Sequence, residues 1–70
     1  MIMNMFKADI MVEYDNGSVS GKVIYAATLE QASNDAALVV QGIVDVCKAG
    51  LDQGVAQVIK HKVKSEACVV

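Results

Sequence analysis

One dipeptide, Asn16-Gly17, lies between two stretches of alternating apolar and polar residues and constrains the fold more than any other feature of this chain. The stretches cover residues 6–15 and 18–27. A period of two is typical of a strand with one buried face, and Asn-Gly tolerates the two positive φ angles of a type I′ turn. The sequence therefore predicts an antiparallel hairpin over about residues 6–27, closed by a two-residue loop.

A two-residue loop also predicts which residues face one another across the hairpin. With Asp15 opposite Ser18, the apolar residues of the first strand all meet residues on the same face of the second. The predicted pairs are Tyr14 with Val19, Val12 with Gly21, Ile10 with Val23, Ala8 with Tyr25, and Phe6 with Ala27. The other face is mainly polar and carries two isolated apolar side chains, Met11 and Ile24. We expect the first face to be buried and the second to be open to solvent.

A capping box, Thr28-Leu29-Glu30-Gln31, predicts a helix over about residues 29–49. At 100° per residue, one side of this helix is apolar and should face the core: Leu29, Ala32, Ala36, Val39, Val40, Ile43, Val46, Cys47 and Gly50. The opposite side is polar and carries Glu30, Asn34, Gln41, Asp45 and Lys48, with Ala37, Leu38 and Val44 interrupting it. Gly50 is expected to end the helix in the left-handed conformation.

Residues from Val55 onward show no helical period, and they predict a third strand over about residues 55–66. Val55, Ile59, His61, Val63 and Ala67 share the side expected to face the helix, and Lys60, Lys62 and Lys64 share the other. A strand placed beside the first one gives the order 2-1-3, in which these lysines run alongside Asp9, Glu13 and Asp15. The predicted fold is a single α+β domain over residues 1–70, a ββαβ unit with a three-stranded antiparallel sheet and one amphipathic helix on one face.

Composition narrows the possible partners. The 70 residues carry a net charge of -2, so the chain lacks the basic field that draws proteins onto nucleic acid. No uncharged run is long enough to cross a bilayer, and Met1–Met5 does not read as a signal peptide, so we expect a cytoplasmic protein. A hydrophobic content of 54% is high for so small a domain. It predicts a homodimer or higher oligomer, formed by strand addition at the third strand or by packing of faces.

The chain offers little for catalysis or metal binding. His61 is the single histidine, and no partner for it is visible. Cys47 and Cys68 stand 21 positions apart without a CxxC motif, so we expect two reduced packing residues and no metal site. The glycines form no phosphate-binding motif. We therefore predict a protein that is not an enzyme and needs no cofactor.

Two exposed surfaces remain as places where a protein partner could bind, the polar helix side and the open sheet face. Their candidate residues are Glu30, Asn34, Leu38, Gln41, Asp45, Met11, Ile24, Lys60, Lys62 and Lys64. The three lysines also leave weak nucleic-acid binding open, although the three aromatic residues, Phe6, Tyr14 and Tyr25, are expected on the helix-covered face. A self-assembling structural or accessory subunit is a further alternative.

The order of the signals resembles that of small ββαβ proteins from bacteriophages and mobile elements, including some type I anti-CRISPR proteins. The resemblance is carried by Tyr14-Asp15-Asn16-Gly17-Ser18 closing a hairpin, Thr28-Leu29-Glu30-Gln31-Ala32 opening a helix, and residues 50–55 leading into a strand. It covers the layout of nearly the whole chain and assigns no functional residue. It implies a stoichiometric inhibitor that covers a surface of a host complex.

Overall fold

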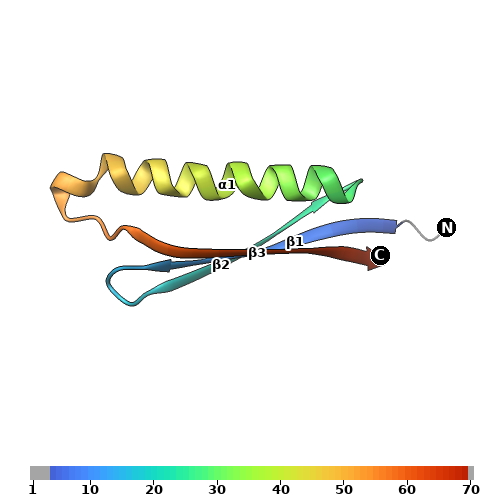
Figure 1. The fold of residues 1–70 in the computed structure, drawn as a ribbon, viewed down its shortest axis with the longest axis horizontal. Helices are drawn as coiled ribbons and strands as arrows, with labels where there is room; N and C mark the ends of the chain where they lie inside the picture. The colour runs from blue at the N-terminus through green and yellow to red at the C-terminus, as the bar shows by residue number, and fades with distance from the viewer. Residues whose placement is uncertain (1–3, 70) are drawn as a thin grey trace.

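The computed structural model describes residues 4–69 and contains one helix packed along one face of a three-stranded sheet (Figure 1). The elements are β1 (Asn4–Tyr14), β2 (Val19–Ala26), α1 (Leu29–Ala49), a short 3-10 helix η1 (Leu51–Gln53) and β3 (Val58–Val69). Both neighbours of β1 run antiparallel to it, and the strand order is β2-β1-β3. The predicted ββαβ class and the order 2-1-3 are confirmed.

The hairpin closes through a three-residue loop, so the predicted two-residue loop was wrong. Tyr14 N donates to Ser18 O at 2.9 Å, and Gly17 N donates to Tyr14 O at 3.0 Å. Gly17 has a φ of 86° and so adopts the left-handed conformation. A left-handed glycine commonly follows the type I turn of a three-residue hairpin loop. Every pair on β2 is consequently shifted by one residue from the prediction, and Ala8 lies opposite Ile24.

The shift exchanges the two faces of β2. Val23 and Tyr25 point away from the helix and are 46% and 56% exposed, whereas Ile24 is partly buried against the core. The predictions that Ile24 lies on the open face and that Tyr25 is covered by the helix were therefore wrong. The reason is steric, since the position opposite the wholly buried Ala8 packs against a filled core, where isoleucine fits and a larger tyrosine ring would not.

The helix begins and ends where the capping signals predicted. Thr28 Oγ1 accepts a hydrogen bond from Gln31 N at 3.1 Å, which confirms the cap. The fully buried residues of the helix are Ala32, Ala36, Val40 and Cys47, and Val39 and Ile43 pack partly buried against the core as predicted. Leu29 and Val46 were predicted to face the core, but they are 46% and 71% exposed because these residues already fill the contact with the sheet.

Gly50 ends the helix for a reason other than the predicted one. Its φ is −94°, so it does not adopt the left-handed conformation, which is found instead at Gly54 with a φ of 82°. Space explains the glycine, because a Cβ added at Gly50 would lie 2.9 Å from the Cβ of Val55. Val55 therefore packs directly on the helix end and precedes the strand, instead of starting it as predicted.

The third strand starts at Val58 and carries a bulge near its beginning. Glu13 lies opposite Lys60 and Tyr14 opposite Val58, so Ile59 is an extra residue on β3. Val58 packs against the core, whereas Ile59 is 62% exposed, and the prediction that Ile59 faces the helix was wrong. Pairing continues to Val69, past the predicted end near residue 66, and Val70 lies outside the described residues.

Gln57 joins the loop before β3 to two other parts of the molecule. Its backbone N donates to Asp15 Oδ1 at 3.1 Å, and Asp15 N donates to Gln57 O at 2.8 Å. Its side-chain Nε2 donates to Cys47 O at 2.6 Å. One side chain and one backbone unit thus tie the hairpin loop to the last turn of α1.

No helix among the described residues is long and apolar enough to cross a membrane. The segment Met1–Met5, which was not expected to be a signal peptide, lies in part outside the described residues, because these begin at position 4.

Candidate binding surface

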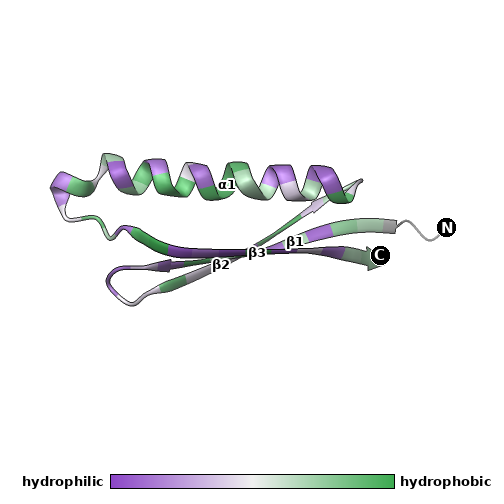
Figure 2. Cartoon of the chain, viewed as in Figure 1, coloured by the Kyte–Doolittle hydropathy of each residue, from purple (hydrophilic) through white to green (hydrophobic). Residues whose placement is uncertain are grey.

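The sheet face that α1 leaves uncovered, here called the open face, is organised strand by strand. The side chains from β1 are mixed, with Lys7, Asp9, Met11 and Glu13 pointing outward by register. The outward residues of β2 are uncharged, namely Val19, Gly21, Val23 and Tyr25. The outward residues of β3 are largely basic, namely Lys60, Lys62, Lys64 and Glu66. Figure 2 shows the hydrophilic middle of β3. The open face is therefore apolar toward one edge and basic toward the other.

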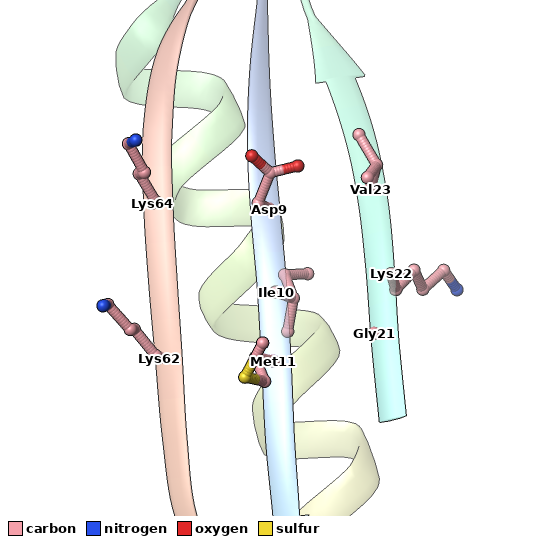
Figure 3. A pocket seen from close by; sticks show the side chains of 8 residues that line it. All are labelled: Asp9, Ile10, Met11, Gly21, Lys22, Val23, Lys62 and Lys64. Carbon is pink, nitrogen blue, oxygen red and sulfur yellow. The ribbon is translucent and has the colours of Figure 1, made fainter. Parts of the chain in front are cut away.

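Four large side chains form an apolar strip on this face. Met11, Val19, Val23 and Tyr25 are 55%, 55%, 46% and 56% exposed. Gly21 lies between the β2 members and has no side chain, which leaves a depression of about 450 Å³ (Figure 3). The depression is bordered by Asp9 and Met11 on the central strand, with Lys62 and Lys64 on one side and Val23 on the other. The strip is thus continuous across two strands and slightly concave.

Acidic residues partly balance the lysines. Lys64 lies opposite Asp9 and Lys60 opposite Glu13, which confirms the predicted alignment at these two positions. Lys62 lies opposite Met11 instead of an acid, and Asp15, the third predicted neighbour, is bound to the Gln57 backbone. Of the three lysines, Lys62 therefore directly adjoins the apolar strip.

Glu66 binds two cations at the far end of the same face. Its carboxylate oxygens lie 3.2 Å from Lys7 Nζ and 3.9 Å from Lys64 Nζ. The hydrogen bond with Glu66, followed by the charge of Asp9, raises the pKa of Lys7 above its ordinary value. Lys7 is therefore fully charged at neutral pH, and Glu66 partly neutralises the charges of both lysines beside it.

The predicted partner residues fall on two surfaces that do not meet. Glu30, Asn34, Leu38, Gln41 and Asp45 are exposed on α1, where Gln41 Nε2 donates to Asp45 Oδ1 at 2.9 Å. Met11 and the three lysines lie on the open face, on the other side of the sheet. The structure therefore does not bring the two predicted sets together.

Sequence reasoning missed a groove of about 540 Å³ between α1 and β2. Leu38, Gly42 and Val46 line its helix wall, and Leu38 and Val46 are each 71% exposed. Lys22 and Tyr14 line the strand side. Leu38, Gly42 and Val46 are spaced by four residues, and residues with this spacing lie one above another on a helix. This spacing was the sequence signal that could have revealed the helix wall of the groove.

The residues considered for chemistry are separated by the helix. His61 lies in a groove between α1 and β3 with Ser33 and Ser65, whose hydroxyls are 3.0 Å apart. Cys47 is buried on the β2 side, and both it and Cys68 are free thiols. Within residues 4–69, no three histidine, cysteine or acidic side chains gather in a group that could hold a metal ion.

Comparison of the chain with protein-family models, curated proteins and solved structures gives no match in any of the three. The properties of its surfaces are therefore what bears on its function. Met11 was correctly predicted on the open face, whereas Val19, Val23 and Tyr25 were not. Placing these three residues on the open face requires the hairpin register, and the alternation of apolar and polar residues does not determine that register.

Proposed function

We propose that the protein is a small, non-catalytic protein-binding module that uses its open face to cover a surface of its partner. The apolar strip of Met11, Val19, Val23 and Tyr25 carries this proposal. Contiguous exposed apolar side chains are typical of interaction sites, and tyrosine and methionine are enriched at the centres of protein interfaces. A stoichiometric inhibitor or an accessory subunit would act in this way, by occupying a surface without chemistry.

The charges beside the strip indicate the character of the partner. Lys62 and Lys64 border the depression, and Lys60 continues the row along β3. Such a rim favours a partner with an apolar patch next to acidic residues, because complementary charge speeds association and selects among partners. Asp9 and Glu13 lie within the same face and oppose binding to an extended phosphate backbone.

Nucleic acid is the second candidate because the observed register places Tyr25 on the same face as the three lysines. Base stacking beside a basic row is how single strands bind to sheets. Only one ring lies on this face among the described residues, and Asp9, Glu13 and Glu66 partly cancel the lysines. The protein partner is therefore favoured.

The test compares two variants in which a large exposed apolar residue becomes glutamate. Met11→Glu alters the centre of the open face, and Leu51→Glu, at a residue 58% exposed in η1, is the matched control. The tagged proteins are purified from nuclease-treated lysate of the organism that encodes the chain. We expect the wild type and Leu51→Glu to retain one partner at fixed stoichiometry, and Met11→Glu to lose it. Equal retention by both variants would refute the proposal, and a partner recovered from untreated lysate but lost from nuclease-treated lysate would indicate nucleic acid.

A further inference from the structure

One edge of the sheet has free backbone groups and little charge. β2 lies at an edge, beside β1 alone (Figure 3). The hydrogen bond from Tyr14 N to Ser18 O fixes the alternation of the antiparallel ladder, in which every second residue of β2 binds β1. The intervening residues direct their N–H and C=O groups outward, and these are Val19, Gly21, Val23 and Tyr25. The outer edge of β2 can therefore accept another strand in register.

The opposite edge, β3, is better protected against strand addition. Lys60, Lys62 and Lys64 follow one another along it at alternate positions, and rows of lysine are a common means of keeping sheet edges apart. β2 carries one charged residue, Lys22, whose side chain extends sideways past the outer edge of the strand (Figure 3). The β2 edge is therefore the more suitable one, although the sequence had pointed to the third strand.

Apolar groups flank the β2 edge on both sides of the sheet. Val23 and Tyr25 lie on the open side. Leu38 and Val46 of α1, each 71% exposed, lie on the other side along the groove between helix and strand. A strand added to β2 would therefore find apolar side chains on both sides of the sheet, with Lys22 also lining the groove on the helix side. An edge that is merely solvated would have polar neighbours instead.

The chain exposes more area than a compact monomer of its mass, enough to accommodate an interface. The molecule exposes 4957 Å² and measures 51 × 19 × 15 Å. A compact monomer of its mass, 7.4 kDa, would expose about 4200 Å². The excess of about 750 Å² is close to the roughly 800 Å² that each partner contributes to an interface of standard size.

We propose that a second copy of this chain binds along the β2 edge, antiparallel to it, with Val23 of both copies at the twofold axis. Two registers overlap the strands almost completely. An axis at Lys22 would place the two Lys22 side chains directly opposite each other in a closely spaced pair, which is unfavourable. An axis at Val23 places Lys22 opposite Ile24 and pairs the outward backbone groups of both copies. The result is a continuous six-stranded sheet with both helices on the same face.

The second register also fills the depression at Gly21. Tyr25 of one copy lies opposite Gly21 of the other, so that its ring covers the position without a side chain. The apolar strips of the two copies then join across the axis. Met11, on the central strand, lies outside this contact, so the dimer and the proposed partner binding can be tested separately.

The mass of the full-length chain is measured by sedimentation over the micromolar range. We expect the wild type to approach twice 7.4 kDa as its concentration rises. Val23→Pro removes an N–H that points outward, and it should weaken association by at least about tenfold while the far-UV circular dichroism stays unchanged. Val23→Thr keeps the N–H and should associate like the wild type. A monomer mass throughout, or equal association of Val23→Pro and wild type, would overturn the proposal.

Disulfide formation tests the register independently of the proline variant. In a Cys47→Ala/Cys68→Ala background, Val23→Cys places two thiols at the axis, with Cα atoms about 5.5 Å apart, within the range of a disulfide. Lys62→Cys on β3 is the control. We expect Val23→Cys to form covalent dimers at least about tenfold faster, because the complex holds the thiols at high effective concentration. Equal rates, or a faster Lys62→Cys, would exclude pairing through β2.

Discussion

Threonine substitutions at two adjacent residues of β2 distinguish the observed hairpin register from the one that alternation favours. Ile24 packs against the core beside Ala8, and Val23 is 46% exposed on the open face. In the alternative register their positions are reversed. Ile24→Thr and Val23→Thr both keep a β-branched side chain, so strand propensity changes little in either variant.

The expected difference follows from burial. Ile24→Thr removes one methyl from a largely apolar environment, at about 0.8 kcal/mol, and places a hydroxyl there at a cost of about 1 kcal/mol or more. The free energy of unfolding should therefore fall by about 2 kcal/mol, which in a domain of this size lowers Tm by about 8–16 °C. Val23→Thr exposes its hydroxyl to water and should cost less than about 0.5 kcal/mol.

Thermal and urea unfolding followed by circular dichroism give both values, with all proteins at one low concentration so that self-association contributes equally. The reasoning is refuted if Val23→Thr is the more destabilising of the two. Equal effects would also contradict the structure, because they would place the two side chains in similar environments.

Two further predictions concern glycines and are checked by urea unfolding. Gly17→Ala should destabilise the protein by about 1–2 kcal/mol because its φ is 86°, whereas Gly42→Ala, where an added Cβ meets no atom within 4 Å, should stabilise the helix by about 0.5–1 kcal/mol. A neutral Gly17→Ala would show that the loop is not the observed one. Gly50→Ala should cost about 1–3 kcal/mol because its Cβ would overlap Val55, and Val55→Ala in the same chain should recover part of this cost. Simple addition of the two losses would rule out the steric explanation.

The general layout could be predicted because its signals are local and agree with one another. Thr28 caps the helix, alternation defines both strands of the hairpin, and the lysines of β3 align with Asp9 and Glu13 of β1. Each of these signals involves a short stretch or one pair of strands. Together they favour the observed order 2-1-3 over the alternative 3-2-1.

The register and the bulge could not be predicted in the same way. Asn16-Gly17 suits a two-residue turn and also the last two positions of a three-residue loop, and these alternatives exchange the faces of β2. Pairing apolar residues favoured the wrong alternative because the core beside Ala8 takes Ile24 of β2, which leaves Val23 and Tyr25 on the exposed side. At Ile59, one extra residue reverses the alternation of β3, and nothing in the local sequence distinguishes it from Val58. The apolar strip could not be predicted because its β2 residues lie on the open face only in the observed hairpin register.

The alanine-lined contact between helix and sheet has a consequence for the life of the protein in a cell. The buried side chains include Ala8, Ala26, Ala32 and Ala36, so the interior supplies little transfer free energy for a chain of this length. A partner that binds only the folded form would add its binding free energy to this small free energy of unfolding. Under the proposed function, copies that have not bound the proposed partner should unfold more often and be removed by proteases, so the amount of this protein should follow the amount of that partner.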